Sequence, residues 1–448
     1  MDIGNLVAST GGLAYTLLFF VLALSIIVAV HEYGHYIVGR WSGIKADVFS
    51  VGFGPVIWSR VDKHGTQWQI AALPFGGYVK FAGDANAASA GADEAALAEM
   101  SPEDLRHTMH GAPLWARAAT VAAGPIFNFI LSILIFGLIF MNRGVATDPL
   151  SVGDLSPMPG ALELSIGDEI TAIGGIDIPA YSDGEAFNAF LEELPVQTPL
   201  PYNVIRDGSA REVLAPFPYP PMITQLVPQS AAFAAGLEVG DVITAIDGTP
   251  IAAFSELKDI VEGSDGRALA LTVWRDGETL DLTMTPRRVD EPTADGSFQT
   301  QWRIGIIGGL FFEPATESPG FVNAFAQGAG QVWRIMDGSI SGLYHMITGA
   351  ISSCNLSGPI GIAQTSGQMA SQGATSFIWF VAVLSTAVGF LNLFPIPVLD
   401  GGHLVFHAYE AVFRRPPPEN FMRGLMIAGL TLVLSLMVFA LYNDIFCP

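Results

Sequence analysis

Three ionisable side chains lie close together near the start of the sequence, in the motif HEYGH: His31, Glu32 and His35. On a helix, positions i and i+4 share one face, so the two imidazoles can bind one metal ion. Glu32 projects in a neighbouring direction, where its carboxylate can accept a proton from a water molecule that the metal activates. The spacing therefore indicates metal-assisted hydrolysis.

The motif directly follows a charge-free run, Leu13–Val30. Ionisable groups are costly in lipid, so three together indicate a functional site or a water-filled cavity more than two histidines that only hydrogen-bond. A cleaved signal peptide is the alternative for this run. The preceding residues MDIGNLVAST contain no Lys or Arg, whereas a signal peptide has a positive n-region. We therefore expect a membrane span.

A catalytic zinc ion takes three protein ligands and keeps one position open, so the histidine pair needs a third ligand. Asp400 lies in an apolar segment and is followed by two glycines, which allow close backbone approach. Pro395 and Pro397 precede it and unwind the helix locally, which lipid tolerates only beside protein or a cavity. Asp400 is the expected third ligand, with His403 as the alternative.

Two features suit a peptide substrate. Asn392, in the same interrupted segment, can donate a hydrogen bond to a substrate backbone, and a helix-packing bond is an equal alternative. A transmembrane substrate must unwind before hydrolysis, and its freed backbone groups then need partners. The stretch WQIAALPFGGYVKFAG can pair with an extended segment, because Gly76 and Gly77 allow close approach. An ordinary hairpin packed on the spans is the alternative.

The elements that must position these residues are membrane spans. Half of the 448 residues are apolar, a high share for a soluble protein. A helix needs about 20 apolar residues to cross the hydrocarbon core. Four charge-free segments meet this requirement: Leu13–Val30, Ala118–Met141, Phe377–Leu399 and Gly424–Asn443.

Lys and Arg near the span ends predict the orientation. They occur between the first and second spans and between the third and fourth, whereas both terminal flanks have none. We expect the loop 40–117 in the cytoplasm, with both termini and the segment between the second and third spans outside.

The net charge of −22 argues against nucleic-acid binding. Two cysteines do not make a disulfide framework, and we expect Cys354 and Cys447 to be free thiols.

The outer segment contains a repeat. IGDEITAIGGIDI (166–178) is similar to VGDVITAIDGTPI (239–251), and VIRDG (204–208) is similar to VWRDG (273–277). The Pro-rich stretch APFPYPP (215–221) indicates the boundary between the two units. The pattern resembles PDZ domains of the bacterial protease-associated type, which bind peptides by β-augmentation. A rigid spacer or sieve above the membrane is an equal alternative.

The remaining segments are less specific. Residues 46–82 combine β-branched and aromatic residues with Gly and Pro, which predicts strands. The acidic, alanine-rich insert 84–105 is expected to be flexible or weakly helical. Residues 318–350 fit either an amphipathic helix on the membrane surface or a linker packed on the spans.

The predicted fold class is a multi-pass α-helical membrane protein with about four transmembrane helices, a membrane-associated β loop and two α+β PDZ-like periplasmic domains. Its predicted parts are the first transmembrane helix with HExxH (1–45), the cytoplasmic-side β loop and acidic insert (46–112), the second transmembrane helix (113–145), PDZ-like domains 1 (146–220) and 2 (221–310), an interfacial helical or linker segment (311–375), the third transmembrane helix with the LDG motif (376–415), and the fourth transmembrane helix with the tail (416–448).

The motifs, in their order, cover nearly the whole chain: HEYGH, GFGP, PFGGYVKF, GPIFNF (124–129), the PDZ-like pair, SGPIGIA (357–363) and NLFPIPVLDGG (392–402). This combination resembles the site-2 protease family of intramembrane zinc metalloproteases, and most closely its bacterial RseP type. The resemblance implies that His31, His35 and Asp400 bind one zinc ion and that Glu32 is catalytic.

The same resemblance implies residues that bind or position the substrate: Asn392, Pro395, Pro397, Gly76, Gly77 and Tyr78. Asn128 falls in the second-span motif, but its role does not follow from the residues.

The resemblance also implies partners and location. Such enzymes cut single-span membrane proteins, typically an anti-sigma factor already trimmed by an upstream site-1-type protease, and some clear remnant signal peptides. The expected location is the bacterial inner membrane, with the active site near the cytoplasmic side. A transporter is a competing function, but it predicts inverted repeats within the membrane. A binding scaffold is another, but it has no need of the base Glu32.

Overall fold

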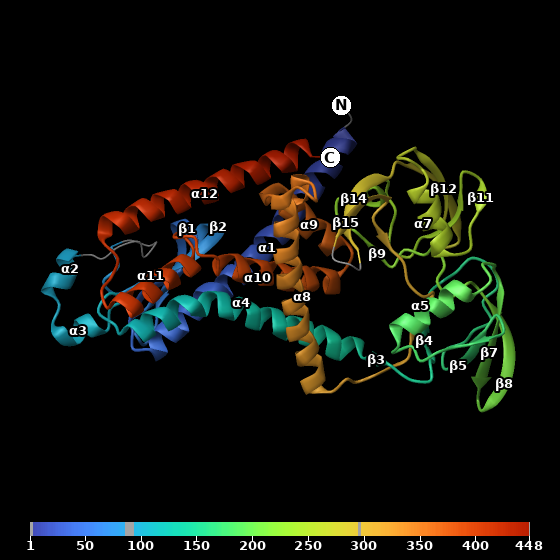
Figure 1. The fold of residues 1–448 in the computed structure, drawn as a ribbon, viewed down its shortest axis with the longest axis horizontal. Helices are drawn as coiled ribbons and strands as arrows, with labels where there is room; N and C mark the ends of the chain where they lie inside the picture. Colours follow the sequence, from blue (N-terminus) through green and yellow to red (C-terminus); the bar gives the residue numbers. More distant parts are fainter. Residues whose placement is uncertain (1–2, 86–93, 294–296, 448) are drawn as a thin grey trace. The chain divides into compact units, whose positions relative to one another are not determined.

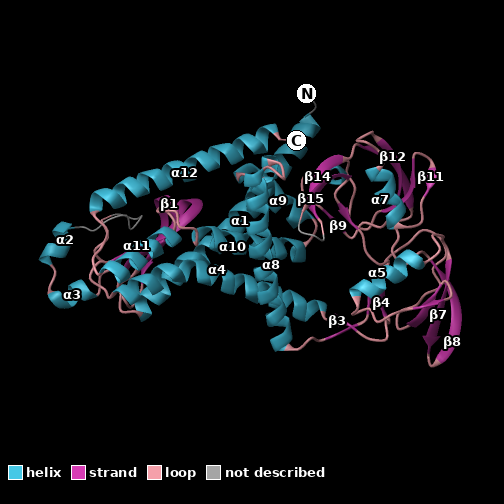
Figure 2. Cartoon of the chain, in the orientation of Figure 1, coloured by secondary structure: helices cyan, strands magenta, loops and turns pink. Residues whose placement is uncertain are grey.

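The structure is a computed structural model that describes residues 3–85, 94–293 and 297–447. Contacts divide the chain into two compact units, each described by itself. The helical unit comprises Met1–Ile139 and Val322–Pro448, and the strand-rich unit comprises Phe140–Phe321. Helices dominate the first and strands the second (Figure 2).

The helical unit contains the elements labelled α1 to α4, β1, β2 and α8 to α12 in Figure 1. Their bounds are α1 Ile3–Trp41, β1 Ala46–Val61, β2 Gln67–Phe81, α2 Glu94–Glu99, α3 Pro102–Arg106, α4 Leu114–Arg143, α8 Phe321–Thr348, the 3-10 turn Ser353–Asn355, α9 Pro359–Ser371, α10 Ala374–Asn392, α11 Asp400–Phe413 and α12 Glu419–Phe446.

Four helices in the described residues are long and apolar enough to cross a membrane: Gly12–Trp41, Leu114–Arg143, Ala374–Asn392 and Asn420–Phe446. They coincide with the four predicted spans, so the prediction of a membrane protein with α and β content is confirmed.

The predicted third span, Phe377–Leu399, is interrupted where Pro395 and Pro397 predict local unwinding. Its helix α10 ends at Asn392, and the LDG motif begins a separate helix, α11, at Asp400. Pro395 and Pro397 lie in the irregular segment between them. Because proline lacks an N–H and clashes with the preceding turn, the apolar run does not continue as one helix.

The strands β1 and β2 form a curled hairpin, in which the first part of β1 lies between two parts of β2. Residues 48–51 of β1 pair with 67–70 on one side and with 77–80 on the other, while the later part of β1 pairs with 67–73. In the described part of the chain, the segment 77–81 therefore has a strand neighbour on one side only. The predicted strands are confirmed, and the second ends in a sheet edge.

The packing of α1 is close because small residues face it. Its buried residues Ala23 and Ile27 pack against Phe377 and Val381 of α10. At Gly34, a Cβ atom would come within 2.5 Å of the Ala123 carbonyl oxygen of α4. Helix α4 thus lies directly against the turn of α1 that carries the HEYGH motif.

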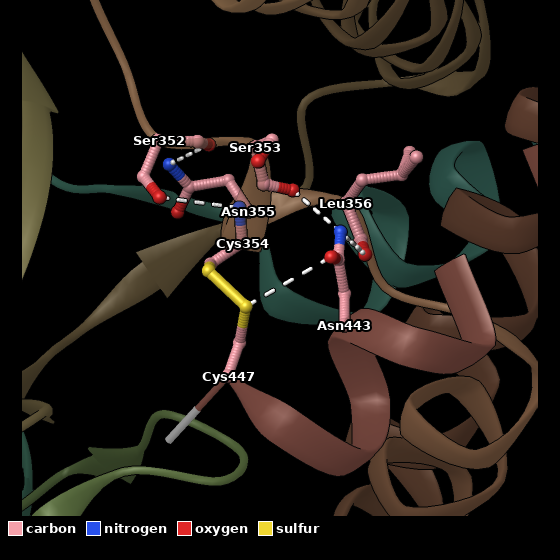
Figure 3. The surroundings of a disulfide bond; sticks show 7 residues. All are labelled: Ser352, Ser353, Cys354, Asn355, Leu356, Asn443 and Cys447. Atoms are coloured by element: carbon pink, nitrogen blue, oxygen red, sulfur yellow. Dashed lines mark hydrogen bonds between the residues drawn. A yellow bond between two sulfur atoms is a disulfide. The ribbon is translucent and has the colours of Figure 1, made fainter. Parts of the chain in front are cut away.

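The two cysteines form a disulfide, so the prediction of free thiols is wrong (Figure 3). The last turn of α12 returns to the 3-10 turn before α9, where Asn443 donates a hydrogen bond of 2.7 Å to the Ser353 carbonyl. Asp444 accepts bonds from two backbone N–H groups at the start of α9. Cys354 and Cys447 are 93 residues apart in sequence, and only the folded chain brings them together.

The other segments of the helical unit are short or partly described. Of the acidic insert, residues 86–93 lie outside the described residues, and the rest contains α2 and α3. Helix α8 buries Ala324, Gly328 and Val332, and a Cβ at Gly328 would meet Gly137 of α4. Its position at a membrane surface stays a prediction.

The strand-rich unit contains two similar four-stranded sheets, each with a helix: β6-β5-β7-β8 with α5, and β11-β10-β12-β13 with α7. Its elements are β3 Val145–Ala146, β4 Val152–Leu155, β5 Glu169–Ile173, β6 Ile176–Asp177, α5 Gly184–Glu193, β7 Leu200–Arg206, β8 Ser209–Ala215, β9 Gln225–Leu226, α6 Ala231–Ala234, β10 Val242–Ile246, β11 Thr249–Pro250, α7 Phe254–Glu262, β12 Leu269–Arg275, β13 Glu278–Met284, β14 Arg287–Pro292, β15 Phe298–Arg303, β16 Ile306–Ile307, β17 Phe312–Pro314 and β18 Thr316–Glu317.

The sequence repeat reappears as a repeated ion pair. Arg206 donates to both oxygens of Asp168 at 2.6 and 2.7 Å, and Arg275 does the same to Asp241. Both aspartates are buried and come from the Gly-Asp turns of the repeat. Burial opposes ionisation of Asp168, but the bonds from Arg206 outweigh it and lower the pKa of this carboxyl group.

Candidate metal centre and its cavity

The two histidines of the HEYGH motif lie on one face of α1. Their Nε2 atoms are 3.1 Å apart, and both rings are largely buried. This closeness follows from the helix, since residues four apart are stacked one turn above the other.

Asp400 completes the cluster from the first turn of α11. Its Oδ2 atom lies 3.1 Å from Nε2 of His31 and 3.6 Å from Nε2 of His35. One ligand atom from each of the three residues falls within 4.8 Å of the others. Among the described residues, no donor gives the buried Oδ2 a hydrogen bond of regular geometry. Two imidazoles and a carboxylate that converge in this way fit a divalent cation such as zinc.

The outer ring nitrogens of both histidines face α4. Nδ1 of His35 lies 2.8 Å from the Thr120 carbonyl oxygen, and Nδ1 of His31 lies 3.2 Å from the amide of Asn128. Bonds of this kind fix the ring orientation of metal-binding histidines. A Cβ at Gly124, between these two positions, would clash with both rings.

Two glycines allow α11 to bring Asp400 to this place. A Cβ at Gly401 would collide with the Leu393 and Phe394 carbonyls, and one at Gly402 would collide with the Ile396 carbonyl. Both glycines are buried. The first turn of α11 is therefore packed directly onto the irregular segment that precedes it.

A cavity of about 450 Å³ opens beside the cluster. The lining residues come from α1, β1, β2, α4, the end of α10, α11 and the loops between them: His31, Glu32, His35, Phe53, Gly77, Tyr78, Val79, Phe81, Met109, His110, Arg117, Thr120, Val121, Asn392, Val398, Leu399, Asp400, His403 and His407. The sheet-edge segment 77–81 forms part of this wall.

Glu32 lies between the cluster and the sheet edge. The backbone of Val79 hydrogen-bonds its carboxylate, and a Cβ at Gly77 would meet its Cγ at 3.1 Å. The absence of a side chain at Gly77 thus keeps the edge strand close to the carboxylate.

The residues predicted to bind substrate divide into two groups. Asn392, Gly77 and Tyr78 line the cavity, whereas Gly76, Pro395 and Pro397 are outside its described lining. Nδ2 of Asn392 donates to the Val388 carbonyl of its own helix at 3.0 Å, and Tyr78 accepts a bond from Gln69.

Sequence reasoning missed a partly buried ion pair that holds Arg117, one of the residues lining the cavity. Arg117 of α4 donates two bonds, of 2.7 and 3.1 Å, to the Glu410 carboxylate of α11. Both side chains are about four-fifths buried, with exposures of 18% and 21%. The signal in the sequence was Arg117 at the start of an apolar span, together with Glu410 later in the segment that begins with Asp400.

The sequence matches the model of peptidase family M50 over residues 19–436. The chain belongs to peptidase family M50. This M50 peptidase is 37% identical over 447 residues to a protein of Agrobacterium fabrum whose name describes a zinc metalloprotease, with 98% of each chain covered. It is 32% identical over 456 residues to the Regulator of sigma-E protease RseP of Escherichia coli, with 95% of this chain and 97% of that protein covered.

The family assigns the activity and the metal. This M50 peptidase is a zinc metalloendopeptidase of the site-2 protease type, as the resemblance in its motifs predicts. His31, His35 and Asp400 are the one group of three or more His, Cys, Asp or Glu side chains in the described residues whose geometry could hold a metal ion.

Proposed function

We propose that this M50 peptidase hydrolyses peptide bonds within or near the transmembrane segment of single-span membrane proteins, with His31, His35 and Asp400 as its zinc ligands. The convergence of these three side chains beside a cavity carries the proposal. The two imidazoles come from a helix that is apolar enough to span a membrane.

Zinc in such a site acts as a Lewis acid, acidifying water and stabilising negative charge. Glu32, at the cavity wall, accepts the proton of the attacking water and returns it to the leaving amine. Asn392 lies at the end of α10, where its amide donates to the Val388 carbonyl. When that bond breaks, the amide donates a hydrogen bond to the substrate carbonyl instead. Pro395 and Pro397 keep the segment before Asp400 irregular, so that α11 starts at the cavity.

The edge segment 77–81 holds the substrate in extended form. A transmembrane helix must unwind to present its scissile bond, and each freed backbone group costs several kcal/mol in hydrocarbon. The sheet edge supplies backbone partners by β-augmentation, next to Glu32. Gly76 takes part through its backbone, which has φ of 137° and turns the chain into this edge.

The biological role we propose is regulated intramembrane proteolysis in a bacterial inner membrane. The name of the Escherichia coli relative states that it regulates sigma E. By analogy, the substrate here is an anti-sigma factor already trimmed by an upstream protease, and remnant signal peptides form a second class. The two α+β units of the strand-rich part act as PDZ-like domains outside the membrane.

The test compares the wild type, Glu32→Gln and the control Glu278→Gln, which makes the same change at an exposed position. Each purified protein is given a single-span substrate in detergent, and its zinc content is measured. The wild type and Glu278→Gln should cut within the span. Glu32→Gln should keep its zinc and lose cutting by a factor of at least about 100. Equal cutting by Glu32→Gln and wild type would remove Glu32 from the proposed mechanism.

A further inference from the structure

Asn128 lies in the GPIFNF motif of α4, and the proposed mechanism leaves it without a role. Its side chain is fully buried, and Nδ2 lies 3.2 Å from Nδ1 of His31. Its other amide atom, Oδ1, has no hydrogen-bond partner among the described residues. A buried amide in a membrane span is costly, so its position beside a proposed metal ligand calls for a reason.

One face of α4 serves both histidines. Residues 120, 124 and 128 are each four apart, so they lie along one stripe of the helix. Thr120 presents a backbone carbonyl to His35, Gly124 leaves room for both rings, and Asn128 presents its amide to His31. Each Nδ1 atom thus has one partner from α4: a backbone carbonyl for His35 and a side-chain amide for His31.

The chemistry of imidazole makes the Asn128 contact depend on the state of the ring. When Nε2 of His31 gives its lone pair to a metal, the ring proton is on Nδ1 and needs an acceptor. When Nε2 carries the proton instead, Nδ1 is itself the acceptor and needs a donor. An asparagine amide can serve as either the donor or the acceptor, because a rotation of about 180° around its last side-chain bond exchanges Nδ2 and Oδ1.

We infer that Asn128 is a positioning residue that holds His31 in the tautomer with Nδ1 protonated, by accepting that proton on Oδ1, and so directs Nε2 to zinc. The inference rests on the proposed ligand role of His31. It explains why a polar residue stands at this place in an apolar helix, and why its oxygen is otherwise unused. The carbonyl of Thr120 does the same for His35.

The test measures zinc affinity by chelator competition on full-length protein in detergent. Asn128→Leu keeps the volume and removes the acceptor, so zinc affinity should fall by roughly 10- to 100-fold. Asn128→Asp keeps an acceptor, so it should bind zinc within about threefold of the wild type or more tightly. In Asn128→Leu, added zinc should restore cutting with an unchanged KM for the substrate, a rescue that a purely structural defect does not give.

Three results would overturn the inference. Wild-type zinc affinity in a folded Asn128→Leu shows that the contact does not position His31. A tenfold loss in Asn128→Asp shows that the amide acts as a donor, and this variant decides the matter if Asn128→Leu fails to fold. His31→Ala is measured in parallel and should lose zinc. If His31→Ala retains zinc, the proposed ligand set is wrong, and the inferred role of Asn128 is wrong as well. If His31→Ala loses zinc but Asn128→Leu binds it like the wild type, only the inferred role of Asn128 is refuted.

Discussion

Nε2 of His31 and Oδ2 of Asp400 lie 3.1 Å apart, although one residue is near the start of the chain and the other near its end. The contact joins α1 to the first turn of α11, and the packing of Gly401 against backbone carbonyls holds that turn in place. Two imidazoles and a carboxylate in this arrangement make up the proposed ligand set, which no single segment contains.

The first prediction separates the two candidates for the third zinc ligand. Asp400→Ala should lower zinc affinity by about 100-fold or more, because it removes a direct ligand rather than an outer partner. His403→Gln should keep stoichiometric zinc, since His403 lines the cavity but is outside the three-residue cluster. Metal analysis after gel filtration decides between them, and loss of zinc from His403→Gln alone would reverse the assignment.

The second prediction concerns the partly buried ion pair of Arg117 and Glu410. Within α11, whose residues are all described, only the two glycines of the first turn are buried, so this pair anchors the far end of the helix. Glu410→Gln leaves Arg117 with no full counter-charge and should destabilise the protein by about 3 kcal/mol. The double variant Arg117→Met, Glu410→Leu should recover most of this loss, as measured by unfolding in detergent. A double variant as unstable as the single one contradicts the pairing.

The third prediction is a pH dependence at the turn between β1 and β2. Asp62 accepts bonds from the backbone of His64 and Thr66 and from the side chains of Trp68 and Tyr36. Burial opposes ionisation, but these bonds outweigh it and lower the pKa of Asp62 to about 2. Since this folded-state pKa is below the unfolded value, the stabilisation is present above about pH 4 and is lost between about pH 4 and 2.

Asp62→Asn should therefore melt at a lower temperature than the wild type at pH 7, and the difference should shrink as the pH falls below about 4. Melting temperatures of both proteins across this range provide the measurement. A difference that stays constant down to pH 2.5 would show that the charge of Asp62 is not what stabilises the turn.

The fourth prediction tests whether the strand-rich unit filters substrates. The chain enters and leaves this unit side by side, because Ala146 pairs with Thr316. Residues 147–315 can therefore be replaced by a short flexible linker. The shortened enzyme should cut both trimmed and untrimmed substrate, whereas the intact enzyme should cut only the trimmed form. If untrimmed substrate stays uncut by a shortened enzyme that still cuts the trimmed form, the size-filter hypothesis is wrong.

Several parts of this protein could be predicted from sequence because they depend on local patterns. The four spans follow from the lengths of apolar runs, and the facing imidazoles of His31 and His35 follow from the period of the helix. The strands β1 and β2 follow from their β-branched and aromatic residues. Composition did not reveal that the end of β2 has a described strand neighbour on one side only, because this depends on how the two strands curl onto one another.

Sequence alone therefore determined which residues could carry zinc chemistry and that His31, Glu32 and His35 would lie in a helix apolar enough to cross a membrane, since both follow from residue type and spacing. Tertiary structure alone decided which distant groups meet: Asp400 with the histidine pair, Arg117 with Glu410, Asn128 with His31, and Cys354 with Cys447. The physical reason is that helix and strand periods act over a few residues, whereas contacts between elements depend on packing. In this chain that packing is set by small residues such as Gly34 and Gly401, where two backbones approach closely.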